Sequence, residues 1–330
     1  MKKILLLILV ILTITTITQK AQCKTNLAER HDIFTPAFQL LWNDFSNLII
    51  KDKIKFQGMQ PKVLKKLNAN KFTQDEISQD FYYKILALKT PELRLKIQDD
   101  LMKKFNEKSD LLDSIDWQPT NAEEYILYAM LKKDINFQKE FEILESKKFN
   151  NSKEKVKYFG VKNENNELKY QVKPLFWLTA QDFAVALDTN EGDKIILHRT
   201  NAKNDIYERY DYIIKHQKTG LSFGESDKLI VPFVNIDEKI QYDALENRKI
   251  IGSELYISKA IEIIKFKLDN KGASIKNEAL LDIMTCSLPI PGRERMYKFD
   301  KPFNIYLIEK DAKLPYFAVR IKDTEYLEKE

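Results

Sequence analysis

The stretch that decides the fold is YISKAIEIIKFKLDNKGASIKNEALLDIMTCSLPIPGRERMYKFDKPFNIYLIEKDAKLPYFAVRI, residues 256–321. Its first regular segment is Ile261–Leu268, whose second half alternates apolar residues with lysines. Ile264, Phe266 and Leu268 would share one face of an extended chain, and the two lysines between them would share the other. This period of two predicts a half-buried β-strand, and the turn-forming DNKG after it predicts where the strand ends.

The last part of the same stretch predicts a buried hairpin. Residues 298–321, KFDKPFNIYLIEKDAKLPYFAVRI, hold two apolar runs, Phe303–Ile308 and Tyr316–Ile321, on either side of a polar turn at residues 310–313. Short apolar runs separated by such a turn pair with each other, so we expect two antiparallel strands. Between the first strand and this hairpin lies a connector with no clear element boundary before two prolines.

A strand, an exposed connector and a closing hairpin in this order resemble the C-terminal end of the serpin family. ISKAIEIIKFKLDNKGAS is similar to the family's strand and hinge, and residues 298–321 are similar to its final hairpin. The resemblance implies an α+β fold in which helices pack on mixed and antiparallel sheets. It also implies that the connector is an exposed loop like the reactive-centre loop of serpins, which a protease attacks.

Upstream, the resemblance rests on the order of three shorter segments. DIFTPAFQLLWNDFSNLI, YILYAMLKKDINFQKEFE and LIVPFVNI resemble, in turn, the family's first buried strand with its helix, a central strand, and a strand with a Pro-x-Phe pattern. We therefore expect Tyr125–Leu131 and Ile261–Leu268 to be central strands of one sheet.

Helical signals dominate the chain before residue 125. Thr35-Pro36 and Thr90-Pro91 each place a capping residue before a proline at the first helical position, and TQDE at residues 73–76 is a capping box. We predict a helix after each of these three signals, and the helix that follows the capping box is predicted to run through Leu88. The helix after Thr90 has its apolar face at spacing four, on Leu93, Ile97, Leu101 and Phe105. Strand-like runs follow without a linker, so residues 24–330 are predicted to form a single serpin-like domain.

The N-terminus predicts export. Lys2 and Lys3 precede the apolar run Ile4–Leu12, which is too short for a membrane span but typical of a signal peptide. AQC at residues 21–23 is a cleavage site, so we expect residues 1–23 to be removed; the alternative is a lipid anchor on Cys23. Removal leaves 51 basic and 49 acidic residues, a net charge of +2. We therefore expect a secreted or periplasmic protein with no nucleic-acid partner.

The resemblance assigns roles within the connector. Fourteen residues beyond Gly272, at the family's usual spacing, lies the reactive bond, Cys286-Ser287. The loop hinge comprises Asn270, Gly272, Ala273, Ile275 and Asn277. If the hinge enters a sheet as a strand, Ala273, Ile275 and the alternate residues after them would be buried. A helix that begins at Ser274 fits the same segment about as well.

Several residues depart from the pattern of inhibitory serpins. Asn270 stands where such hinges carry Glu, and bulky or charged residues, Lys276 and Glu278 among them, stand where small ones are usual. A polar trio that holds the central sheet closed in the family is replaced by Phe38, Tyr128 and Glu262. These departures favour a loop that inserts slowly or not at all.

The sequence therefore predicts a protein that is nominally an inhibitor of serine or cysteine endopeptidases and acts by presenting a loop. The alternative is a non-inhibitory serpin-fold binding or structural protein. A hydrolase that uses Cys286 is a more distant alternative, because no helix N-terminus lies beside that thiol to lower its pKa. We expect a monomer that has no cofactor and no metal, does not span the membrane, and has a protease or another extracytoplasmic protein as its partner.

Overall fold

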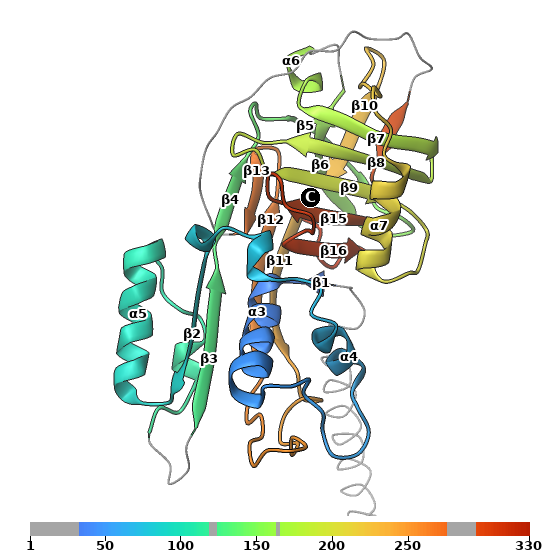
Figure 1. Ribbon diagram of the computed structural model, residues 1–330. Coiled ribbons are helices and arrows are strands. Elements are labelled where there is room, and N and C mark those ends of the chain that lie inside the picture. Colours follow the sequence, from blue (N-terminus) through green and yellow to red (C-terminus); the bar gives the residue numbers. More distant parts are fainter. Residues whose placement is uncertain (1–32, 119–123, 163–165, 276–294) are drawn as a thin grey trace, which may run out of the picture.

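Four β-sheets and a few helices make up the computed structural model, which describes residues 33–118, 124–162, 166–275 and 295–330 (Figure 1). All neighbouring strands are antiparallel except β10 (Lys228–Pro232) and β14 (Met296–Lys298), which run parallel. The predicted α+β class, with helices on mixed and antiparallel sheets, is therefore confirmed.

The largest sheet has six strands and contains the predicted hairpin. Its strands, in order, are β1 (Ile33–Phe34), β16 (Phe317–Ile321), β15 (Phe303–Ile308), β9 (Lys194–Arg199), β8 (Asp182–Asp188) and β7 (Val172–Thr179). Phe303 lies opposite Ile321 and Leu307 opposite Phe317, in the antiparallel register expected from the sequence. Every residue of β15 and β16 is buried, because one face of the sheet packs on the main core and the other packs on α7 (Ile206–His216).

A second sheet has four strands, in the order β14, β10, β6 (Lys155–Val161) and β5 (Glu142–Lys148). β14 is the first strand after the connector in the sequence, and it pairs in parallel with β10. The strand expected in LIVPFVNI is present, since β10 covers its first half.

The predicted central sheet is divided in two. β11 (Val234–Gln241), β12 (Ile261–Leu268), β13 (Gly272–Ile275) and β4 (Lys133–Asn136) form one sheet, while β2 (Tyr82–Leu88) pairs only with β3 (Tyr125–Leu131). The prediction that Tyr125–Leu131 and Ile261–Leu268 belong to one sheet is therefore wrong, although each is a strand. The chain passes from β3 to β4 at Lys132, and β3 there diverges from β12 (Figure 1).

Two of the three predicted helices form. α3 (Pro36–Asp44) begins after Thr35 and continues as a π-helix, η1 (Phe45–Ile50). α5 (Pro91–Phe105) is capped by the Thr90 hydroxyl, which accepts a hydrogen bond from the Leu93 N–H at 3.1 Å, and its four apolar residues at spacing four are all buried.

The helix predicted after the capping box is wrong. Residues 74–76 and 79–81 form the short 3-10 turns η2 (Gln74–Glu76) and η3 (Gln79–Phe81), and β2 follows. Pairing of seven residues with β3 outweighs a local helical preference, and the tyrosines that open this run favour a strand.

The remaining helices are short. They are α4 (Lys62–Asn68), η4 (Leu112–Ser114) and α6 (Asn166–Lys169). The longer α7 has Asp205 as its N-cap, a signal from which the sequence analysis predicted no helix. None of the helices in the described ranges has both the length and the apolar character needed to cross a bilayer.

Candidate functional site

The predicted loop hinge begins with a tight turn. The Asp269 N–H donates to the Gly272 carbonyl at 2.9 Å, and the Lys271 N–H donates to the Asp269 carboxylate at 2.8 Å. Asn270, at the tip, is buried, and its carbonyl accepts a hydrogen bond from the Phe141 N–H at 2.8 Å. The turn is therefore fixed to the neighbouring chain instead of projecting into solvent.

After the turn, the hinge lies between two strands. Gly272–Ile275 forms β13, antiparallel both to β12 and to β4. A Cβ on Gly272 would lie 1.9 Å from the Ile135 carbonyl oxygen, so only glycine permits this approach of the two backbones. Ala273 and Ile275 are buried and Ser274 is partly exposed, which is the alternation expected for an inserted strand. The described part of the hinge is therefore a strand up to Ile275, and the residues over which the alternative helix would run lie outside the described residues.

A buried ion cluster fixes the point where β3 and β12 diverge. Lys133 pairs with Ile275, and its ammonium lies 2.8 Å from the Asp193 carboxylate and 2.5 Å from Glu309. The Tyr316 hydroxyl donates to Asp193 at 2.8 Å. Burial raises the pKa of Asp193, and the Lys133 ammonium opposes that increase. The cluster ties β4 to the β8–β9 turn and to the closing hairpin.

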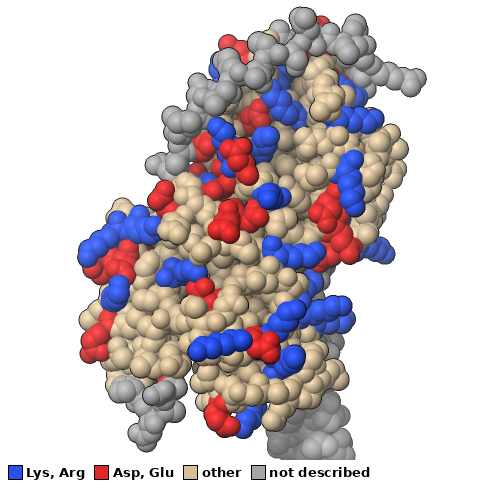
Figure 2. All heavy atoms as spheres, viewed as in Figure 1, with Lys and Arg blue, Asp and Glu red and all other residues tan. Residues whose placement is uncertain are grey.

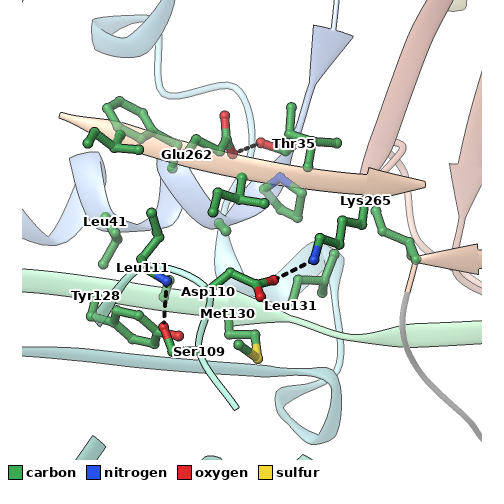
Figure 3. Close-up of a pocket in the computed structure, with 18 residues that line it drawn as sticks. Thr35, Leu41, Ser109, Asp110, Leu111, Tyr128, Met130, Leu131, Glu262 and Lys265 are labelled. Carbon is green, nitrogen blue, oxygen red and sulfur yellow. Dashed lines mark hydrogen bonds and ion pairs between the residues drawn. The ribbon is translucent and has the colours of Figure 1, made fainter. Parts of the chain in front are cut away.

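Directly beyond Ile275 lies a cleft of about 120 Å³ between β3 and β12, with α3 as its floor (Figure 3). β3 and β12 belong to different sheets and do not pair with each other within the described residues, so an edge of each strand faces this space. Phe38, Tyr128 and Glu262, the residues aligned with the family's polar trio, all line it. The sequence therefore located three residues of one site from segments far apart in the chain.

Glu262 ties β12 to the start of α3. Its carboxylate accepts hydrogen bonds from the hydroxyls of Thr35 and Tyr242, the latter at 2.9 Å, and from the Phe38 backbone. Thr35 makes no side-chain capping bond, so Glu262 supplies the acceptor that the helix N-terminus needs. Burial raises the pKa of Glu262 to about 7, and the three hydrogen bonds oppose that increase.

The segment between α5 and β3 crosses the front of the cleft. The Lys265 ammonium on β12 donates to the Asp110 carboxylate at 2.8 Å (Figure 3). A hydrogen bond joins Ser109 to the Tyr128 hydroxyl on β3. We call residues 106–117 the strap. It contacts both edges of the cleft, and its Asp110–Lys265 pair is half exposed to solvent.

The far end of the connector is anchored by a bidentate ion pair. The Arg295 guanidinium donates to the buried Asp227 carboxylate at 2.6 and 3.0 Å, and also to the Ser222 carbonyl. The Arg295 N–H donates to the same carboxylate at 2.8 Å. These contacts fix Arg295 in place, and β14 begins at the next residue.

The outcome for the predicted site residues follows from these contacts. Asn270 lies at the tip of the turn, Gly272 and Ala273 lie in β13, and Ile275 lines the cleft. Asn277, Cys286 and Ser287 lie outside the described residues. Sequence reasoning missed two functional features. The strap has no recognisable motif, and the Asp227–Arg295 pair joins residues 68 positions apart, which no local pattern reveals.

Comparisons with known proteins agree with this architecture. No protein-family model matches the chain, and no curated protein matches it in sequence. In structure the chain is similar to tengpin, a thermophilic serpin in its native state, with a TM-score of 0.51, 11% identity and 88% of each chain covered. Serpin48 of the insect Tenebrio molitor has a TM-score of 0.47 at 11% identity, covering 90% of this chain and 94% of its own. Human thyroxine-binding globulin in complex with thyroxine has a TM-score of 0.48 at 11% identity, with 91% and 94% covered.

The likeness to tengpin shows the fold. The chain has a serpin fold, as its C-terminal stretch predicted, with the central sheet split below the hinge.

Proposed function

We propose that this is an exported serpin-fold protein that presents its connector to an endopeptidase and nominally acts as an inhibitor. The mature chain would begin at Lys24, and the bond offered to the protease would be Cys286-Ser287. One observation carries the proposal: β13 already occupies the head of a strand position whose continuation, the cleft between β12 and β3, is open.

The driving force for insertion would come from strand pairing and apolar burial. A strand in the cleft would pair the free edges of β3 and β12 and would continue the alternation begun by Ala273 and Ile275. Burial of further large aliphatic side chains at ~25 cal/mol per Å² of apolar surface gives several kcal/mol. This exceeds the ~1–3 kcal/mol cost of burying Asn277 without a partner.

A second function, that of a non-inhibitory binding or structural protein, is favoured by the strap. Before an incoming strand could reach the cleft, it would have to break the contacts of Asp110 and Ser109 with the two cleft edges. Together with Asn270, Lys276 and Glu278, this barrier would let a protease finish cleavage and leave before insertion. The two functions therefore differ in how fast the cleaved loop inserts into the cleft compared with how fast the protease leaves.

A protease panel distinguishes them. The mature protein is incubated with serine and cysteine endopeptidases, and a covalent complex that survives denaturant is sought on a gel. N-terminal sequencing of the released fragment identifies the cleaved bond. A complex supports inhibition. Cleavage without a complex and without any rise in melting temperature supports the second function, and a main cleavage outside residues 276–294 would contradict loop presentation itself.

Two hinge variants sharpen this experiment. Ala273→Asp places a charge in the buried position between β12 and β4, whereas Ser274→Asp places the same charge on the partly exposed side of β13. If insertion traps the protease, the first variant becomes a substrate and the second still forms the complex.

A further inference from the structure

One short segment carries a net positive charge that the small net charge of the whole chain does not reveal. Residues 51–71 contain seven lysines and one aspartate, a net charge of +6, more than the +2 of the whole chain after the predicted leader is removed. All seven lysines are exposed. On the face drawn in Figure 2, basic side chains lie next to one another near the position of α4 in Figure 1.

The backbone holds the first of these lysines on one outward-facing surface. A bend with a left-handed backbone at Lys51 opens the segment, and in residues 53–56 the exposed Lys53 and Lys55 alternate with the fully buried Ile54 and Phe56. The Ile251 N–H donates to the Lys55 carbonyl at 2.8 Å, so the loop at residues 247–257 lies alongside this segment. This loop lies at the opposite end of the molecule from β10 (Figure 1).

Large apolar side chains stand exposed beside the lysines. Met59 is 85% exposed, and Ile251 is 54% exposed. The Arg248 guanidinium donates to the Met59 carbonyl at 2.5 Å. This bond joins the loop at residues 247–257 to the loop that contains Met59. Leu48, 59% exposed, is in η1, just before Lys51. We call the set the lysine surface; it comprises Leu48, Lys51, Lys53, Lys55, Met59 and Ile251.

The ammonium groups of this surface are available to a partner. Among the described residues, Lys51, Lys53 and Lys55 make no ion pair, whereas Lys249 nearby is bound to Glu254 at 3.1 Å. The one acidic residue of the segment, Asp52, accepts a hydrogen bond from the Lys53 N–H at 2.6 Å. The surface therefore presents unneutralised positive charge around exposed apolar groups.

We propose that the lysine surface binds the surface of an anionic lipid bilayer. Lysines would contact the lipid phosphates, while Met59, Ile251 and Leu48 would enter the boundary between headgroups and acyl chains. A sulfated polysaccharide would satisfy the lysines but would gain nothing from three exposed apolar side chains. Binding by this end would leave β10, and the Arg295 anchor beside it, facing away from the membrane.

The test is sedimentation of the mature protein with vesicles of phosphatidylcholine, with and without phosphatidylglycerol. We expect binding only to the anionic vesicles, weakening as salt is raised. Lys51→Glu/Lys53→Glu/Lys55→Glu should lower partitioning on the order of a hundredfold or more. The matched control, Lys203→Glu/Lys215→Glu/Lys218→Glu near α7, changes the net charge equally and should bind nearly as wild type does.

A second variant tests the lipid directly. Met59→Ser/Ile251→Ser leaves the charge unchanged, and it should weaken vesicle binding while retention on a sulfated-polysaccharide resin stays the same. Unchanged melting temperatures verify that each variant is folded. Equal binding to neutral vesicles, or anionic binding that survives both the charge-reversal and the serine variants, would overturn the proposal, as would polysaccharide binding without vesicle binding.

Discussion

Replacing Glu262 with glutamine should change how stability depends on pH. Glu262 is buried between β12 and the start of α3, and its pKa is raised from the ordinary 4.5 to about 7. The folded state therefore holds a proton that the unfolded state has already released. Stability must fall as pH rises from about 4.5 to about 7, and above that it no longer depends on this group.

The size of the effect follows from the same two values. The difference between 4.5 and about 7 corresponds to ~3 kcal/mol, the cost of holding the ionised carboxylate in its buried site. Glutamine carries no charge and keeps one acceptor oxygen. Its amide NH2 replaces the other oxygen and can donate to the hydroxyl of Thr35 or Tyr242, since a hydroxyl also accepts. Its advantage over the wild type should therefore be ~3 kcal/mol larger above about pH 7 than near pH 5.

Urea unfolding of both proteins across this pH range measures the difference directly, because other titrating groups contribute equally and cancel. The control is Glu254→Gln, which removes an exposed carboxylate by the same substitution and should leave the pH profile of the wild type unchanged. If the stability difference between Glu262→Gln and wild type does not vary with pH, the reasoning about this carboxyl is wrong.

Three further outcomes are expected. Lys133→Met should destabilise the fold by ~3–5 kcal/mol in urea unfolding, because it leaves the buried Asp193 and the partly buried Glu309 without a cation; an effect below ~1 kcal/mol would show that water reaches the cluster. Asp227→Asn should make the chain before β14 easier to cleave in limited proteolysis, because it removes the charge that holds Arg295, and cleavage as slow as in the wild type would contradict that anchoring role. N-terminal sequencing of the exported protein should begin at or near Lys24; a retained leader, or a lipid on Cys23, would refute the predicted cleavage.

The sequence by itself determined the elements whose signals are local. The alternation in Ile261–Leu268, the two apolar runs around the turn at 310–313, and the Thr90-Pro91 cap each give the observed strand, hairpin or helix. In these segments the pattern of burial and the local backbone preference agree, so no distant contact was needed to choose between structures.

The tertiary structure decided what depends on residues far apart in the chain. Tyr82–Leu88 is a strand because β3 pairs with it along its whole length, against the helical signal before it. From Ser274 onward the sequence left strand and helix open, and at Ser274 and Ile275 the strand forms because β4 and β12 supply partners. The resemblance aligned Glu262 with a member of the family's polar trio, but only the packing of α3 and Tyr242 against it excludes water and raises its pKa. Desolvation and two-sided pairing are properties of the assembled neighbours, and no single segment encodes them.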